Sequence, residues 1–148
     1  MKPFVSTYDP KKVIITFGGV PITGFADGTF ISITQENDSW AKKVGADGEV
    51  IRARSNDDTC EVTITLQQSS DSNIALSVVQ ATDRLTGFGM RPLIITDLNG
   101  VTIQSWMQAW IKKAPDWEYG KEASDRAWVL STGQPAVTTY GGVIGTPV

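Results

Sequence analysis

The sequence predicts a mainly β protein with one α-helix, and three observations support that fold class. Short segments of alternating apolar and polar residues recur along the chain, turn residues separate them, and only one segment has apolar residues at helical spacing. In EVTITLQ, residues 61–67, the apolar residues fall on one face of a strand and Thr63, Thr65 and Gln67 on the other. The 148 residues, 41% of them hydrophobic, are enough for a single domain (1–148) with a buried core.

The first part of the chain indicates three strands joined by glycine turns. KVIITF (12–17) is typical of a strand, and the Gly-Gly pair that follows it is a common hairpin connection. We therefore expect VPITGF (20–25) to return antiparallel to it. An Ala-Asp-Gly turn then leads into TFISITQE (29–36), a further strand with Ser32 and Thr34 on its polar face.

One segment, NIALSVVQATDRL (73–85), predicts a helix. Asp71 or Ser72 can cap its first backbone N–H groups, and Gly87 can end it. The apolar residues that recur at helical spacing are Ile74, Val78, Ala81 and Leu85. We expect this helix to pack on the sheet.

The second half continues with strands. RPLIITDL (91–98) and VTIQSWMQAWIKK (101–113) are joined by an Asn-Gly pair, the strongest short hairpin signal, and DRAWVLST (125–132) predicts a last strand. GQPAVTTYGGVIGTPV (133–148) is rich in Gly, Pro and Thr and predicts an extended C-terminal tail.

A long connection, residues 37–57, separates the strand at 29–36 from the strand at 58–68. It shows no sustained hydrophobic period. Connections of this length inside a domain are uncommon and are often functional. The simpler alternative is a flexible hairpin loop.

Composition excludes several classes of function. A net charge of -3 and a pI near 4.8 argue against a nucleic-acid-binding surface, which usually carries a basic excess. The chain has no histidine, so Ser-His-Asp and Cys-His catalysis is excluded, and no phosphate-binding or dinucleotide fingerprint occurs. The single cysteine, Cys60, excludes an intramolecular disulfide and a Cys-clustered zinc site. We expect no enzyme activity, no cofactor and no metal.

Targeting signals are also absent from the sequence pattern. No apolar run approaches the ~20 residues that cross a bilayer. MKPFVSTYDPKK lacks the apolar segment of a signal peptide. We expect the chain to be cytosolic when made and the monomer not to bind membranes.

Two groups of residues leave other functions open. Carboxylates at predicted strand ends can in principle form the acid and base of a glycosidase, although such groups are usually solvated; they are Glu36, Glu61, Asp97 and Asp116. Aromatic and amide residues share one predicted face of the strand at 101–113: Gln104, Trp106, Gln108 and Trp110. This pattern suits sugar stacking on a lectin-like sandwich, but we favour packing beneath the helix or against a neighbouring subunit.

Specific blocks of sequence resemble a known family. They are KVIITFGGVPITGFADGTFISITQENDSW, GADGEVIRARSNDDTCEVTITLQQSSDSN, the PLIITDLNG hairpin after the helix, and a late KEASDRAW segment. From about Val13 to Trp128 the chain resembles the tail tube proteins of contractile-tailed bacteriophages, in particular the small structural proteins related to those of phages phiTE and KPP10.

The resemblance implies a fold shared with the ring protein of type VI secretion. A β-sandwich flanked by a helix would form hexameric rings, with one β-barrel completed across subunits, and stacked rings would form a tube for DNA passage during ejection. The implied partners are other copies of the chain, the tail sheath, the baseplate and the tape-measure protein. The implied location is the virion tail, assembled in the host bacterial cytoplasm. A baseplate or tail-completion ring protein of the same fold is the main alternative, and a sugar-binding module the lesser one.

Two sets of residues receive roles from this resemblance. We expect a channel lining that is rich in Thr, Ser, Gln and acidic residues and poor in Lys and Arg, because a neutral or acidic wall lets DNA slide; its candidates are Ser32, Thr34, Glu61, Thr63, Thr65 and Gln67. We expect residues 37–57 to contact the next ring, with Trp40 as apolar anchor. The charged candidates of this loop are Asp38, Lys42, Lys43, Asp47, Glu49, Arg52 and Arg54.

Overall fold

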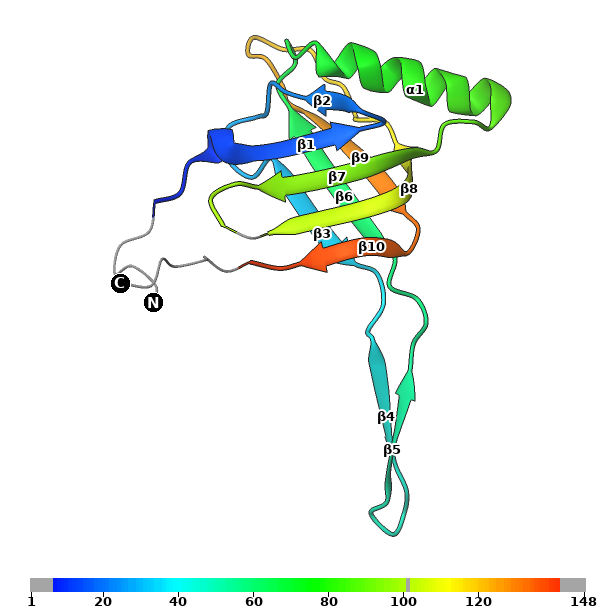
Figure 1. Cartoon of the computed structure of the whole chain (residues 1–148). Helices are drawn as coiled ribbons and strands as arrows, with labels where there is room; N and C mark the ends of the chain where they lie inside the picture. Colours follow the sequence, from blue (N-terminus) through cyan, green and yellow to red (C-terminus); the bar gives the residue numbers. More distant parts are fainter. Residues whose placement is uncertain (1–6, 101, 142–148) are drawn as a thin grey trace.

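The computed structural model describes residues 7–100 and 102–141, and these form a short 3₁₀ turn, one α-helix and ten strands (Figure 1). The elements are η1 (Pro10–Lys12), β1 (Val13–Phe17), β2 (Val20–Ile22), β3 (Ile31–Gln35), β4 (Trp40–Val44), β5 (Val50–Arg54), β6 (Cys60–Leu66), α1 (Ser72–Thr86), β7 (Arg91–Asp97), β8 (Ile103–Lys113), β9 (Arg126–Thr132) and β10 (Pro135–Thr139). The expected mainly β fold with one helix is therefore confirmed.

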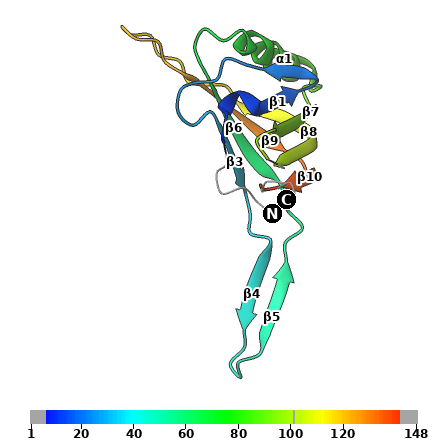
Figure 2. The same cartoon turned by 60° about the vertical axis from the view of Figure 1, so that its left-hand side comes forward.

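The strands form a two-layered body and a separate arm. The main sheet has the order β2-β1-β7-β8-β9-β6-β3, and β10 also pairs with β8. Figures 1 and 2 show β1, β7 and β10 in one layer, with β3, β6 and β9 crossing behind them in a second. In the described residues this sheet does not close on itself, because β2 and β3 remain edge strands.

Strand β8 belongs to both layers because it changes partners halfway. Its residues 103–106 pair with β7 and β10, whereas 109–113 pair with β9. At the change, one residue of β7, Pro92, opposes two of β8, Met107 and Gln108. Such a bulge bends a strand and lets it turn from one layer into the next.

The core lies between the two layers. Strand β6 alternates fully buried and half-buried residues along its whole length, as its sequence predicts. Leu66 of β6, Leu93 of β7 and Leu130 of β9 are completely buried, and Trp106 of β8 is nearly so. Each such side chain contributes about 1.5–3 kcal/mol on leaving water, so this apolar cluster dominates the stability of the fold.

The two predicted hairpins are confirmed. Gly18 and Gly19 both have positive φ (63° and 81°), the geometry of the two-residue turns that match strand twist, and Phe17 pairs with Val20 across them. Strands β7 and β8 pair antiparallel around the Asn-Gly turn. Asn99 also holds the start of the chain, because its side chain accepts a hydrogen bond from the Asp9 N–H (2.8 Å) and donates one to the Asp9 carbonyl (3.0 Å).

The helix forms where predicted, but the predicted packing face is wrong. Gly87 ends α1 in the left-handed conformation with φ 74°, as expected. The side chains that face the sheet are Leu76, which is 2% exposed, and Val79. The residues at helical spacing that were expected to pack, Ile74, Val78, Ala81 and Leu85, are all exposed. The helix therefore carries apolar residues on two faces. The face with Leu76 and Val79 packs on the sheet, and the face with Ile74, Val78, Ala81 and Leu85 remains exposed to solvent.

The long connection at 37–57 is an ordered hairpin and not an irregular loop. Strands β4 and β5 pair antiparallel from Trp40 opposite Arg54 to Val44 opposite Val50. All ten residues of the two strands are exposed. Because neither face of this hairpin is buried, its sequence lacks the alternation of apolar and polar residues that usually indicates a strand. This hairpin, called the arm below, projects from the end of the body where β3 and β6 meet it (Figures 1 and 2).

The predicted C-terminal tail contains a strand. β10 pairs antiparallel with the first half of β8, and Gly133 donates its N–H to the Gln108 carbonyl at 2.8 Å. The rest of the predicted tail, residues 142–148, lies outside the described residues.

Candidate assembly surfaces

Five of the six proposed channel residues share the outer face of the layer made by β3, β6 and β9. Ser32 lies opposite Thr63 and Thr34 opposite Glu61, so their side chains stand on the same face. Thr65 continues this face one step along β6. All five side chains are exposed or half-buried.

Gln67 differs from the other five candidates because it lies beyond the end of β6. Its N–H donates to the Gly24 carbonyl (2.8 Å) and its carbonyl accepts a hydrogen bond from the Asn73 side chain (2.9 Å). It therefore belongs to the turn that leads into α1.

The same outer face carries residues that sequence reasoning missed. Ser131, Val129 and Ala127 of β9 pair with Glu61, Thr63 and Thr65. These are the residues between the buried positions of β9, so the alternation in DRAWVLST could have placed them here.

Two lysines from β8 reach this face although a wall poor in Lys and Arg was expected: Lys112, and Lys113, which lies opposite Val129. Lys112 Nζ donates to Glu61 Oε2 at 3.0 Å. The hydrogen bond and the charge of Glu61 both raise the pKa of Lys112, so the lysine stays protonated. Both groups are well exposed, and their charges offset each other on this surface.

The sugar-stacking alternative does not fit the structure, whereas the favoured packing role fits Trp106. Trp106 is 1% exposed and faces the core with Gln104, which is also buried. Trp110 lies after the bulge and pairs with Ser131, so it shares the outer face with Glu61. The two tryptophans therefore point to opposite faces of β8, because the extra residue in the bulge reverses the alternation.

The arm holds a cluster of cations beside an aromatic ring. Lys42 lies directly opposite Arg52, and Trp40 directly opposite Arg54, so all four side chains share one face of the ribbon. The Arg52 guanidinium stacks over the Trp40 ring at 3.6 Å from its centroid. Like charges directly opposite each other destabilise a strand pair, so this face is suited to an acidic partner.

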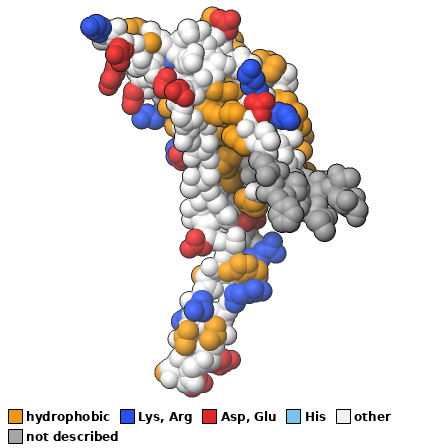
Figure 3. All heavy atoms as spheres, turned by 90° about the vertical axis from the view of Figure 1, so that its left-hand side faces the viewer, with side chains coloured by type: hydrophobic (Ala, Val, Ile, Leu, Met, Phe, Trp, Pro, Cys, Tyr) orange, Lys and Arg blue, Asp and Glu red, His pale blue; other side chains and the backbone are white. Residues whose placement is uncertain are grey.

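The other candidates in this region occupy the opposite face, the tip and the lead-in of the arm. Lys43 stands on the opposite face, paired with Ile51. Asp47 and Glu49 lie in the turn at the tip, where Glu49 N–H donates to Asp47 Oδ1 (3.3 Å), and Asp38 precedes β4. Figure 3 shows the Lys and Arg side chains along the arm and the acidic ones at its tip.

The root of the arm is held by a carboxylate. Asp57 accepts hydrogen bonds from the Thr59 hydroxyl, the Thr59 N–H (3.1 Å) and the Asn37 side chain. These bonds, with the Thr59 hydroxyl first, lower the pKa of Asp57. Gln134 adds a link to the C-terminal part, because its amide donates to the Asn56 carbonyl at 2.9 Å.

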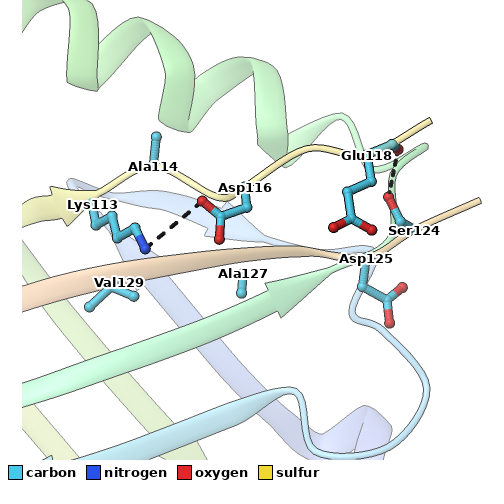
Figure 4. Close-up of a pocket in the computed structure, with 8 residues that line it drawn as sticks. All are labelled: Lys113, Ala114, Asp116, Glu118, Ser124, Asp125, Ala127 and Val129. Carbon is cyan, nitrogen blue, oxygen red and sulfur yellow. Dashed lines mark hydrogen bonds and ion pairs between the residues drawn. The ribbon is translucent and has the colours of Figure 1, made fainter.

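The end of the body opposite the arm is acidic. There the segment between β8 and β9 projects from the body (Figures 1 and 2), and its charged residues are Asp116, Glu118, Lys121, Glu122 and Asp125. Three of the four carboxylates line a cavity of about 300 Å³, where Lys113 pairs with Asp116 at 3.9 Å and Ser124 Oγ donates to the Glu118 carbonyl at 3.0 Å (Figure 4).

Residues 7–100 and 102–141 contain no candidate metal site. No three His, Cys, Asp or Glu side chains of this part come together in a way that could hold a metal ion. Among the four candidate carboxylates, Glu61 pairs with Lys112 and Asp97 accepts hydrogen bonds from the N–H and side chain of Asn99. No helix in the described part is long and apolar enough to span a membrane.

Comparisons with known proteins place these surfaces in context. The family model of the bacteriophage PhiTE tail tube protein matches residues 14–138. The chain is 28% identical over 134 residues to the structural protein ORF10 of Pseudomonas phage KPP10, covering 85% of this chain and 78% of that protein.

Solved structures of contractile injection systems have the same fold. The cap that terminates the tube of the anti-feeding prophage matches with a TM-score of 0.62 at 11% identity, covering 93% of this chain and 95% of the other. The sheath/tube terminator of the extracellular contractile injection system PVC matches with a TM-score of 0.60 at 10% identity, over 90% and 97%. The sheath-tube complex of PVC gives 0.55 at 10% identity, over 87% and 89%.

Proposed function

The chain belongs to the family of the bacteriophage PhiTE tail tube protein, and from this premise we propose that it forms hexameric rings that stack into a tail tube around a channel for DNA. Membership makes it a structural protein of the virion tail, and its fold is that of contractile systems. The observation that best supports the proposal is the open sheet, whose outer layer has a polar face and an unpaired edge strand.

The channel wall in this proposal is the outer face of β3, β6 and β9. Its threonines and serines are uncharged, Glu61 offsets Lys112, and Asp116 offsets Lys113, which lies opposite Val129 on the same face. Duplex DNA carries one negative charge per ~1.7 Å of axis, so a wall with no net basic excess would not hold it. The sheet would close into a barrel only when neighbouring copies join, which also removes its exposed edges.

The arm in this proposal contacts the next ring. It lies at one end of the body and the acidic segment at the other, so copies stacked head to tail bring Lys42, Arg52 and Arg54 against carboxylates. An isolated two-stranded hairpin is at best marginally stable in water, so the arm gains from such a support. Trp40 would be buried in the same contact.

The remaining roles follow from the tube. The layer of β1, β2 and β7 with α1 would face the sheath, and the ends of the tube would meet the baseplate and the tape-measure protein. Subunits would assemble in the host cytoplasm and carry no catalytic activity.

A terminating ring of the same fold is the second candidate. Two of the similar structures are a tube-terminating cap and a sheath/tube terminator, which favours it specifically. Electron microscopy of the purified protein separates the two functions. Long hollow tubes support the tail tube subunit, isolated rings support a terminator, and a protein that stays monomeric at all concentrations contradicts both.

A further inference from the structure

Two free strand edges lie on opposite sides of one layer. Every residue of β3 pairs only with β6, and in β8 the residues after Ala109 pair only with β9 among the described strands. The order β3-β6-β9-β8 in Figure 1 puts these two edges at the two lateral sides of the body. Resting on the proposed ring, we propose that β3 of one copy pairs with Trp110–Lys113 of β8 in the next copy.

The direction of the strands favours this pairing. The pairs β8 with β9, β9 with β6 and β6 with β3 are all antiparallel, so β3 runs opposite to β8 of its own copy. Rotation about a ring axis keeps the direction of each strand along that axis. The β8 of the next copy therefore also runs opposite to β3, and the new ladder is antiparallel.

The faces of the two strands limit the possible registers. Residues directly opposite each other share a face, and Thr34 and Trp110 both lie on the outer one. This fixes which residues share a face across the junction: Ser32 and Thr34 stand on the face of Trp110, whereas Ile33, which packs against the core, stands on the face of the buried Ile111. Ala109 already pairs with Arg91, so the ladder ends there.

Apolar side chains lie on both sides of the proposed junction. Figure 3 looks onto the side of β3 and shows a vertical band of hydrophobic side chains beside the strand that leads to the arm. On the other side, the C-terminal end of α1 extends past β8 (Figure 1), with Leu85 86% exposed and Phe88 77% exposed. A contact between two different surfaces that closes by rotation makes a ring, and here the helix end of one copy covers the apolar band of the next.

Disulfide cross-linking tests the pairing directly. Ser32 and Trp110 stand on the same face on the two sides of the proposed junction, so Ser32→Cys with Trp110→Cys places the two thiols where the strands would meet. Within one copy, β6 and β9 separate these residues by three strand spacings, about 14 Å, too far for a disulfide. Oxidation can therefore link only neighbouring copies.

The expected result on non-reducing gels is a series of cross-linked oligomers, the largest of which contains as many copies as the ring. The control combines Ser32→Cys with Met107→Cys, because Met107 is exposed but lies where β7 occupies that edge of β8. The control should give no such series of oligomers. A second pair, Thr34→Cys with Trp110→Cys, checks the register.

The outcomes separate this inference from the proposed function. Rings or tubes in the microscope that give no more cross-links than the control overturn the pairing and leave the proposed function standing. A protein that remains monomeric at every concentration overturns both.

Discussion

Cys60 shows how the core controls one reactive group. Cys60 is 8% exposed at the start of β6, and its thiol donates to the Asp58 carbonyl at 3.7 Å. Burial is the main cause that raises the pKa of Cys60, and the charge of Glu36 adds to it. The thiolate is the reactive form of cysteine. Burial therefore limits the access of reagents to the sulfur, and the raised pKa lowers the fraction of thiolate.

We therefore expect Cys60 to resist thiol reagents in the folded protein. At pH 8 the reaction with a colorimetric disulfide reagent should be at least about 100-fold slower than in denaturant, because it requires opening of the structure. The denatured chain should titrate as one thiol. Reaction of the native protein at the rate of a free thiol would contradict this placement of Cys60.

Asp57 predicts a pH effect at the root of the arm. Hydrogen bonds from Thr59 and Asn37 lower its folded pKa below the ordinary value of 3.8, so its contribution is present above that value and is lost as the pH falls through the folded pKa. NMR of the Thr59 amide should show a transition below pH 3.8. Asp57→Asn should abolish that transition, and a titration midpoint above 3.8 would refute the hydrogen-bonded carboxylate.

At the scale of elements, the proposed contact of the arm with the next ring would depend on Trp40, over which Arg52 stacks. Truncation of a central interface aromatic commonly weakens a contact by about 2 kcal/mol, which is about 30-fold in affinity. Trp40→Ala should therefore give shorter tubes or rings alone at concentrations where the natural sequence forms tubes, as measured by electron microscopy and sedimentation.

Trp40→Phe is the matched control, because a phenyl ring keeps an aromatic face for Arg52. It should restore most of the tube length. Because Trp40 is 45% exposed in the single copy, the melting temperature of unassembled protein should change little in either variant. Tubes of normal length and stability with Trp40→Ala would show that the arm does not stack the rings.

The exposed face of α1 gives a prediction about ring formation. Leu85→Glu puts a charge on the helix end that extends past β8, and it should leave the monomer folded while preventing rings. Ile74→Glu is the matched control, on the same helical face at the other end, and should still form rings. Size-exclusion chromatography with circular dichroism measures both. Equal assembly of the two variants would rule out this role of the helix end.

The success of sequence reasoning differed between elements for physical reasons. β6 alternates because one face packs the core, so its burial was predictable. The bulge at Met107 was not, because a change of strand partners leaves no local pattern, and it reversed the expected face of Trp110. Both faces of α1 are apolar, and the spacing alone could not decide which one packs. The arm has no buried face at all.

At the scale of the whole molecule, the candidate assembly surfaces lie in two directions: at the two ends of the body and at its two sides. The arm and the acidic segment lie at opposite ends of the body, and the free edges of β3 and β8 lie at its sides. A head-to-tail contact along one axis and a closing contact around it together specify a tube. The outer face of β3, β6 and β9 is then the surface that passing DNA would meet.

That arrangement predicts that basic residues on this face would convert a channel that DNA passes into one that holds it. Thr63 and Thr65 are half-buried and stand on the outer face, so Thr63→Lys with Thr65→Lys adds two cations per copy to the wall. Each phosphate that is neutralised adds about -0.9 to the slope of log affinity against log salt, so retention should be strong at low salt and fall steeply as salt rises. Duplex DNA protected from nuclease inside preformed tubes is the quantity to measure.

The control adds the same two charges to α1 with Ser77→Lys and Ala81→Lys, where bound DNA should stay open to nuclease. If tubes of the natural sequence protected as much DNA as tubes of the Thr63→Lys, Thr65→Lys variant, a wall that lets DNA slide would be contradicted.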